Sequence, residues 1–354
     1  MGKEPKRRLF PFYRGFCTAY QPHGRPISVS TVFRLINGVF DMCLYPKLIR
    51  NKRYLPNKKN GGHTPYCDDE RKKAVAIGCG KCIECRKKRA NEWRVRLMIE
   101  LKNHPENAHF VTMTYSDESL SKFEQEEALN VASRSIELFR KRWYKKYRCG
   151  IKHFLICELG GNDSQRMHLH GILWTEKSKE EVEEVWNYGF VDYGEFVNEK
   201  TVNYIIKYIF KIDEKHPNFV TKVWTSKGIG QGYAEGEGKC FNKFRGISTK
   251  DYYRMPSGMK VALPIYIRNK IFDENQREEL WMQKLDQKKR YVCGEKIDIS
   301  DKRGVQLYFK CLKYHQERTG ALGYSSDVWI KKSYRKSLEK LNGIDTFETQ
   351  PKNN

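Results

Sequence analysis

Residues 167–174 read Met-His-Leu-His-Gly-Ile-Leu-Trp, a run that is typical of a buried β-strand. Side chains two positions apart on a strand point to the same face of the sheet, so His168 and His170 would project side by side. Two adjacent imidazoles can bind one metal ion. The alternative is a pair of strand histidines that bond only to neighbouring side chains. The flanking sequence distinguishes these two interpretations.

A second strand-like run, Lys-His-Phe-Leu-Ile-Cys-Glu-Leu, occupies residues 152–159, and the Gly-Gly-Asn-Asp-Ser-Gln-Arg segment between the two runs is rich in turn residues. The two runs therefore predict one antiparallel hairpin. If its loop folds symmetrically about Asp163, Glu158 lies opposite His168, with the two Cβ atoms about 5 Å apart. His168, His170 and Glu158 would then hold Mg²⁺ or Mn²⁺, with Zn²⁺ as a further option. A shift of one residue would turn Glu158 to the other face.

The segment at 201–212, Thr-Val-Asn-Tyr-Ile-Ile-Lys-Tyr-Ile-Phe-Lys-Ile, predicts an amphipathic helix. Its apolar side is formed by Val202, Ile205, Ile206 and Ile209. The opposite side carries Tyr204, Tyr208 and Lys211, with Lys207 beside them. Residues four apart are neighbours on a helix surface, so the two phenols lie one turn apart.

These tyrosines and lysines suit a nucleophilic attack on a phosphate. A phenol has a pKa of about 10 and is a weak nucleophile at neutral pH. A neighbouring lysine and a metal-polarised phosphate would both help it attack, and Lys207 and Lys211 could also hold that phosphate. The alternative is that Tyr204 and Tyr208 only pack along an amphipathic helix.

Three cysteines, Cys79, Cys82 and Cys85, follow a C-x-x-C-x-x-C pattern that can converge on one Zn²⁺. A structural zinc site needs four ligands, and the candidates for the fourth are Cys43, Cys67 and His63. Iron–sulfur ligation and a set of free thiols are the alternatives. The residues after the cysteines predict a helix with a strongly basic start that could lie along a DNA backbone, formed by Arg86, Lys87, Lys88 and Arg89.

The composition favours a nucleic-acid partner. Among 354 residues, 67 Lys and Arg stand against 43 Asp and Glu, a net charge of +24, and 13% of the residues are aromatic. Basic side chains neutralise phosphates and aromatic rings stack on the bases of single-stranded DNA. The composition also fits a basic ribosome-like protein, or a non-catalytic zinc-containing DNA-binding or packaging protein. No Walker-type phosphate loop is present, so we expect no ATPase or helicase activity from this chain.

We expect a reduced, non-membrane environment. No apolar run approaches the ~20 residues that span a bilayer, and the basic start of the chain is followed by too short an apolar stretch for a signal-peptide core. The 11 cysteines are an odd number, which favours reduced thiols over a disulfide framework.

The elements expected after residue 107 alternate in the manner of one α+β domain. They are a strand at 108–115, a helix at 126–147, the hairpin at 151–174, a helix at 178–187 and a strand at 189–197, followed by the tyrosine helix. Strands with helices packed against them predict an antiparallel sheet backed by helices.

The chain therefore divides into three regions. Residues 1–106 hold the candidate zinc motif and the basic helix, residues 107–214 form the core with the histidines and tyrosines, and residues 215–354 form a C-terminal extension. In that extension we expect a loop-rich segment at 215–262 and then two or three helices, including ones at 274–285 and 328–332.

Together these residues resemble the HUH endonucleases, whose two-tyrosine class carries His-x-His followed by Tyr-x-x-x-Tyr. Further segments are similar to the replication initiators of the gokushovirus branch of the microviruses, namely FVTMTYSDE at 110–118, CELG at 157–160, CGKCIECR at 79–86 and PIYIR at 264–268. The chain departs from that family in having Arg166 and Met167, not proline, before the histidine pair. It also has Leu169, not an aromatic residue, between the histidines.

The resemblance implies a ferredoxin-like or RRM-like core and a rolling-circle initiator. Such an enzyme nicks one strand at the origin of single-stranded or replicative-form viral DNA, forms a 5′-phosphotyrosine link and leaves a 3′ hydroxyl for a host polymerase, with a host helicase as a further partner. A second tyrosine then allows the strand to be cut again and rejoined. The resemblance also implies the cytoplasm of a host bacterium, and Cys43, in Cys43-Leu-Tyr-Pro46, as the fourth zinc ligand.

Overall fold

The computed structural model describes residues 43–123, 127–160, 167–194, 197–210, 219 and 221–322. The chain forms two compact units. In the first unit, described from 48 to 76, strand β1 (Lys47–Arg50) pairs with β2 (Ala74–Ile77), and 3₁₀ turns lie between them at Lys52–Tyr54, Lys58–Asn60 and Glu70–Lys73. The described residues of the histidine, tyrosine and cysteine groups lie in the second unit, whereas the alternative zinc ligands His63 and Cys67 lie in the first.

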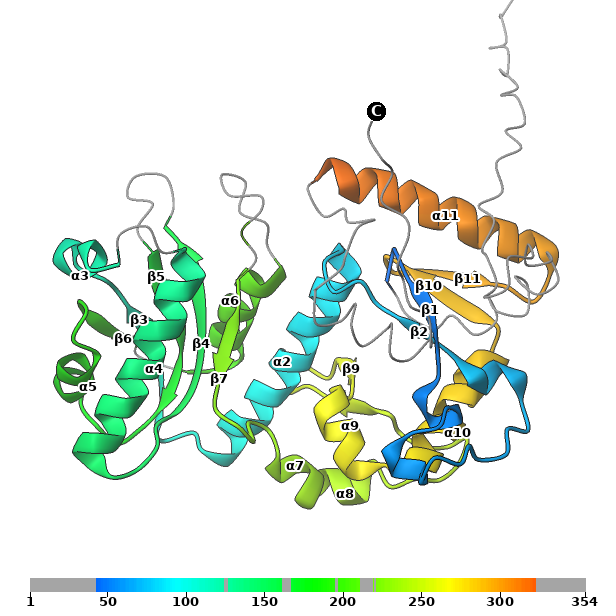
Figure 1. Cartoon of the computed structure of the whole chain (residues 1–354), viewed down its shortest axis with the longest axis horizontal. Helices are drawn as coiled ribbons and strands as arrows, with labels where there is room; N and C mark the ends of the chain where they lie inside the picture. Colours follow the sequence, from blue (N-terminus) through cyan, green and yellow to red (C-terminus); the bar gives the residue numbers. More distant parts are fainter. Residues whose placement is uncertain are drawn as a thin grey trace, which may run out of the picture. The chain divides into compact units, whose positions relative to one another are not determined.

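The second unit contains a five-stranded antiparallel sheet (Figure 1). Its strands lie in the order β6-β3-β5-β4-β7, where β3 is Ala108–Met113, β4 Lys152–Leu159, β5 Met167–Trp174, β6 Val191–Gly194 and β7 Val223–Thr225. Helix α4 (Ala128–Tyr147) connects β3 to β4, and α5 (Lys179–Trp186) connects β5 to β6. The first four strands and two helices therefore follow a βαββαβ order.

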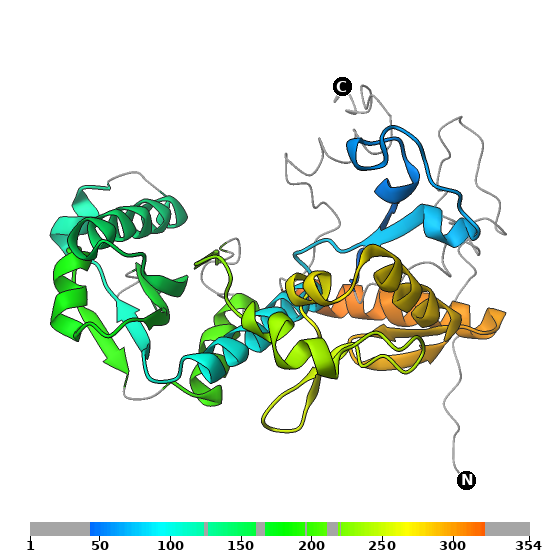
Figure 2. The same ribbon diagram turned by 90° about the horizontal axis from the view of Figure 1, so that it is seen from below.

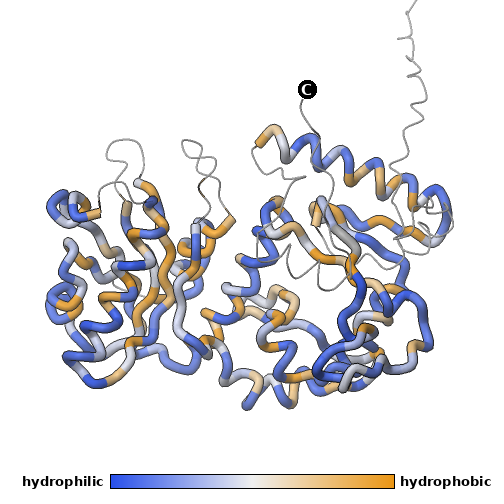
Figure 3. Tube along the Cα trace, viewed as in Figure 1, coloured by the Kyte–Doolittle hydropathy of each residue, from blue (hydrophilic) through white to orange (hydrophobic). Residues whose placement is uncertain are grey.

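Helices cover both faces of this sheet. Side chains alternate between faces along each strand, so Val111, Leu155 and Leu169 point toward α4 and α5 and form one buried cluster with them. The side chains between them, such as Phe154 and Ile172, point to the opposite face of the sheet. They pack against α2 (Ile83–Asn103) and α6 (Glu199–Phe210). Figure 3 shows the apolar strands between the more polar helices.

Local sequence explains where these helices begin and which side they bury. Ser178 caps α5 by accepting a hydrogen bond from Glu181 N, and the Glu181 side chain bonds back to Ser178 N. Helix α6 buries the predicted apolar side, consisting of Val202, Ile205, Ile206 and Ile209. The long helix α2 begins at the cysteine motif and packs its C-terminal half on the sheet (Figure 2).

The rest of the second unit is built from short elements around two further hairpins. Strand β8 (Tyr252–Arg254) pairs with β9 (Lys260–Ala262), and β10 (Lys289–Val292) pairs with β11 (Glu295–Asp298). The helices are α3 (Asp117–Ser121), α7 (Gly232–Glu235), α8 (Glu237–Phe241), α9 (Ile265–Ile271), α10 (Glu274–Asp286) and α11 (Lys302–Ala321). No helix in the described part of the chain combines the length and apolar character needed to cross a bilayer.

The α+β class and the antiparallel sheet are confirmed, and so is the hairpin register that pairs Glu158 with His168. The described helices α9, α10 and α11 agree with the two or three helices expected at 264–342, but the hairpin of β10 and β11 between α10 and α11 was not expected. Its two turn residues, Cys293 and Gly294, both have positive φ, and cysteine is an unusual residue for that turn. The three-residue strand β7 in the segment expected to be loop-rich was also missed.

Two other expectations are not decided by the structure. The predicted helix at 328–332 lies outside the described residues. The expected region boundaries at 106/107 and 214/215 both fall inside the second compact unit and stay predictions.

Candidate functional site

The central hairpin brings a carboxylate and two imidazoles together on one face of the sheet. Glu158 pairs with His168 across β4 and β5, and His170 is two residues further along the same face. One Glu158 oxygen, Oε2, lies 3.3 Å from His168 Nε2 and 3.1 Å from His170 Nε2. The three ligand atoms lie within 4.8 Å of one another, so one ion could contact all of them.

The environment keeps the Glu158 carboxylate charged. Burial would raise the pKa of Glu158, but hydrogen bonds with His168 and His170 outweigh it and lower that pKa to about 2. At neutral pH the group therefore offers one negative charge and two imidazoles. This mixed set of oxygen and nitrogen donors fits a divalent ion such as Mn²⁺ or Mg²⁺, and also fits Zn²⁺.

A residue that the sequence analysis did not identify, Thr112, fixes one of the imidazoles. Thr112 pairs with His170 across β3 and β5, and its Oγ1 lies 3.1 Å from His170 Nδ1. This hydrogen bond orients the ring with Nε2 toward Glu158, and such bonds hold metal-ligating histidines in one tautomer. Only knowledge of the β3–β5 pairing, which is not local in sequence, could have identified Thr112.

Both tyrosines of helix α6 lie against His170 of this group. The Tyr208 ring stacks on the His170 ring with centroids 5.6 Å apart and 17° between the planes, while the Tyr204 ring meets His170 edge-on at 6.1 Å. The Tyr208 hydroxyl donates to the Tyr204 hydroxyl at 2.6 Å. The two phenols thus form one pair beside the histidines.

The two phenols differ in environment. Tyr204 exposes 45% of its surface, whereas Tyr208 is half-buried. Burial, and then its hydrogen bond with Tyr204, raises the pKa of Tyr208. Lys207 is exposed on the same helix. Lys211 lies outside the described residues.

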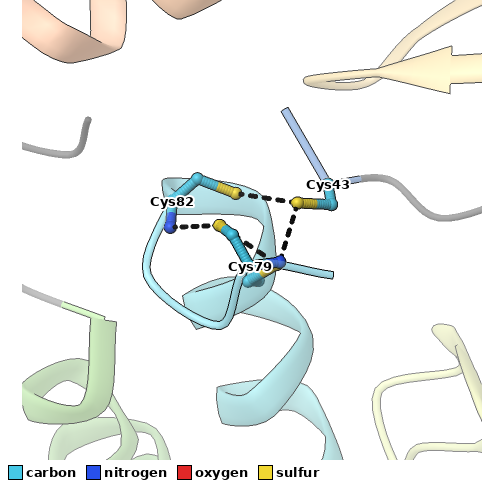
Figure 4. A group of neighbouring side chains, drawn as sticks. Cys43, Cys79 and Cys82 are labelled. Carbon is cyan, nitrogen blue, oxygen red and sulfur yellow. Dashed lines mark hydrogen bonds between the residues drawn. The ribbon is translucent and has the colours of Figure 1, made fainter. Parts of the chain in front are cut away.

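A second group is formed by Cys43, Cys79, Cys82 and Cys85. Cys43 Sγ lies 3.8 Å from Cys82 Sγ (Figure 4). Cys79 Sγ lies 3.9 Å from Cys85 Sγ. Four sulfurs held about 2.3 Å from a tetrahedral zinc ion have edges of about 3.8 Å. The spacing therefore fits a structural zinc site.

Backbone amides donate hydrogen bonds to two sulfurs of the cysteine group. Cys79 N donates to Cys43 Sγ at 3.1 Å, and Cys82 N donates to Cys79 Sγ at 3.2 Å (Figure 4). Side-chain hydrogen bonds with Cys43 and then Cys82 lower the pKa of Cys79. Of the three candidates for a fourth ligand, Cys43 is the one that the structure brings to this group, and the Cys67 thiol instead donates to the Asp69 carbonyl.

The basic start of α2 is only partly at the surface. Lys87 and Arg89 are exposed and Lys88 is half-exposed. Arg86 is buried, and its Nε donates to the Lys81 carbonyl at 2.9 Å. Arg86 therefore helps to close the cysteine loop, and the DNA-binding role of these four residues stays a prediction.

The part of the chain that carries the histidines and tyrosines is similar to a known protein family. Residues 108–213 match the family model of the replication-associated protein ORF2/G2P. The matched segment contains Glu158, both histidines and both tyrosines, and it ends before the C-terminal elements. The cysteine group lies outside it.

Two phage proteins are similar to this chain over a longer span. The replication-associated protein ORF2 of Spiroplasma virus 4 is 29% identical over 234 residues, covering 54% of this chain and 69% of that protein. The replication-associated protein ORF4 of Chlamydia phage 1 is 25% identical over 207 residues, covering 51% of this chain and about half, 49%, of that protein. No solved structure matches the chain.

We expect metal analysis of the purified protein to find about one tightly held zinc ion per chain, because four thiolates at tetrahedral spacing bind zinc strongly. Cys82→Ser should lower the zinc content and the melting temperature together, since Cys82 also begins α2. Cys149→Ser, which changes an exposed cysteine outside the group, serves as the matched control. A folded and active protein without bound metal would contradict the zinc site.

Thr112→Val should weaken Mn²⁺ binding at the Glu158, His168 and His170 group by roughly 10–100-fold, because His170 loses the hydrogen bond that orients it. Thr112→Ser keeps a hydroxyl at the same place and should restore most of the affinity. The measurement is a direct binding titration of each variant with Mn²⁺. Equal titration curves for wild type and Thr112→Val would show that the hydrogen bond does not position the ring.

Proposed function

We propose that this chain initiates replication of a phage genome as a metal-dependent endonuclease that nicks one DNA strand with a tyrosine. One observation carries the proposal: the Tyr204–Tyr208 pair lies directly against the Glu158, His168 and His170 group, with the Tyr208 ring stacked on His170. A structural role for the histidines would not require two hydrogen-bonded phenols beside them. The names of the two phage relatives, both replication-associated proteins, agree with this role.

The residues divide the work as follows. Glu158, His168 and His170 would hold the divalent ion, which supplies Lewis-acid polarisation of the scissile phosphate. One phenol oxygen forms a bond to phosphorus as the bond between phosphorus and the 3′ oxygen breaks. The phenol proton passes to solvent, and the 3′ oxygen takes up a proton and leaves as a hydroxyl. The product is a 5′-phosphotyrosine and a free 3′ end.

A second phenol would allow the reaction to be completed by a second cut and rejoining of the strand. While the first tyrosine is bonded to the 5′ phosphate, the other can cut the regenerated origin. The newly released 3′ hydroxyl can then attack the first phosphotyrosine and close the circle. Lys207, exposed one residue before Tyr208, would contact the attacked phosphate. We predict the same phosphate contact for Lys211, one helical turn further along the chain.

The fold agrees with this assignment. The βαββαβ order and the strand order β6-β3-β5-β4 support a ferredoxin-like core, which we assign to the two-tyrosine HUH type. The proposal implies single-stranded or replicative-form viral DNA as substrate. It also implies a host polymerase that extends the 3′ end and a host helicase, in the cytoplasm of a host bacterium.

The proposal is tested by incubating the protein with a single-stranded DNA circle from the source genome and Mn²⁺ or Mg²⁺, followed by a denaturing gel. We expect a linear strand joined to the protein, formed only with a divalent ion and lost in His168→Ala. Tight binding without cleavage or adduct on DNA that contains the origin would favour the other candidate, a non-catalytic zinc-containing DNA-binding or packaging protein.

A further inference from the structure

A basic groove lies away from the proposed catalytic site. It encloses about 1250 Å³ between helix α4, the start of β4 and the outer strand β7. Its lining includes five basic side chains, which are Arg140, Lys141, Lys152, Lys222 and Lys227. The lining holds one carboxylate, Glu137, which is paired with Lys141 at 2.7 Å. The groove is therefore strongly positive.

Two aromatic rings lie among these cations. Tyr144, on α4, exposes 59% of its surface. Trp224, on β7, is half-buried, and its Nε1 donates to Ser133 Oγ at 3.1 Å. Lys222 Nζ lies 5.4 Å from the Trp224 ring and donates to the same Ser133 Oγ at 3.3 Å. These contacts hold the indole and its neighbouring lysine in place without a ligand.

The groove is separate from the histidine and tyrosine site. Strand β4 carries Lys152 in the groove and Glu158 in the site. At about 3.3 Å per residue, these two residues lie about 20 Å apart along the strand. The two also use different helices, because the groove is lined by α4 and the site by α6. Lys152 is paired with Glu100 at 2.5 Å and Lys141 with Glu137, so Arg140, Lys222 and Lys227 carry the argument.

We propose that this groove binds a second segment of single-stranded DNA, outside the segment that is cut. This inference rests on the proposed function, because the groove would hold the DNA strand that leads to or from the nick. Lysines and arginine would neutralise phosphates, and the Tyr144 and Trp224 rings would stack on bases. Stacking and phosphate contacts do not read base identity, so this binding is independent of sequence.

The test is the binding of fluorescent oligothymidylate, which carries no origin, to the full chain at several salt concentrations. We expect Lys222→Gln/Lys227→Gln to weaken binding by about tenfold near physiological salt. The slope of log affinity against log salt should fall by about 1.4, which is two contacts at about 0.7 each. Tyr144→Ala should weaken binding by roughly tenfold through the loss of a stacked base.

Matched controls come from α11. Lys310→Gln/Lys313→Gln removes the same charge from exposed positions, and Tyr314→Ala removes a ring that is 55% exposed, close to the value for Tyr144. These controls should bind oligothymidylate nearly as wild type does. If the groove variants and the controls lose affinity equally, the groove has no special role and the inference is overturned. Tighter binding of oligouridylate through the same residues would overturn the assignment to DNA.

The inference and the proposed function can fail separately. If wild-type protein nicks the origin circle but the groove variants bind oligothymidylate like the controls, the endonuclease stands and the groove inference fails. If no condition yields nicking and yet the groove variants lose binding, the groove is a DNA site and the endonuclease proposal fails.

Discussion

Replacing Glu158 by glutamine is expected to reduce nicking of origin DNA by roughly a thousandfold or more. Glutamine keeps the size of the side chain but removes the only negative charge among the three proposed ligands. A bound ion contributes several kcal/mol to the stabilisation of charge on the attacked phosphate, and about 4 kcal/mol corresponds to a thousandfold in rate. The rate should be measured across a Mn²⁺ titration, so that weaker ion binding is separated from slower chemistry.

A carboxylate on another surface provides the control. Glu118→Gln, on α3, removes a charge that is 84% exposed and paired with Lys122 in an i, i+4 contact, so nicking should be unchanged. Because the pKa of Glu158 is about 2, its carboxylate is ionised at any pH suited to the assay, and protonation of Glu158 should not limit the rate near neutral pH. Nicking by Glu158→Gln at the wild-type rate would remove Glu158 from the proposed ligand set.

Sequence alone predicted the parts of this site that depend on local periodicity. The alternation along residues 152–174 and the turn-forming loop predicted the hairpin, and the assumption of a loop symmetric about Asp163 gave the observed pairing of Glu158 with His168. The helical period of residues 201–210 similarly separated the apolar side of α6 from Tyr204 and Tyr208. These features need only neighbouring residues, which is why they could be predicted from one sequence.

The parts that were missed depend on contacts between distant segments. Thr112 reaches His170 only because β3 pairs with β5, a pairing of residues 58 apart in the chain. Gly171 is explained only by close packing, since a Cβ there would lie 2.0 Å from the Phe154 carbonyl oxygen. Strand β7 has three residues, too few for a recognisable alternation. The choice of Cys43 as fourth ligand came from family resemblance, because spacing alone left three candidates.

The second large effect concerns the tyrosines. We expect Tyr204→Phe to reduce the first covalent adduct by roughly a thousandfold and Tyr208→Phe to leave much of it, while the double variant forms none. Tyr204 is the more exposed phenol, and its oxygen accepts the hydrogen bond from Tyr208, which would stabilise it as charge develops during attack. Tyr208 has its pKa raised by burial and by that hydrogen bond, so it is the poorer first nucleophile.

The adduct should be digested with a protease, and the peptide that carries the nucleotide identified by mass spectrometry. In wild type after one round, the nucleotide is expected on Tyr204. Tyr208→Phe should accumulate this adduct and fail to close the circle, since the second nucleophile is absent. Tyr266→Phe, which removes a phenol on α9 that is bonded to Gln231, controls for the general loss of a tyrosine hydroxyl. A nucleotide found on Tyr208 in wild type, with Tyr204→Phe forming the adduct normally, would reverse the order, because burial would then not have prevented Tyr208 from attacking first.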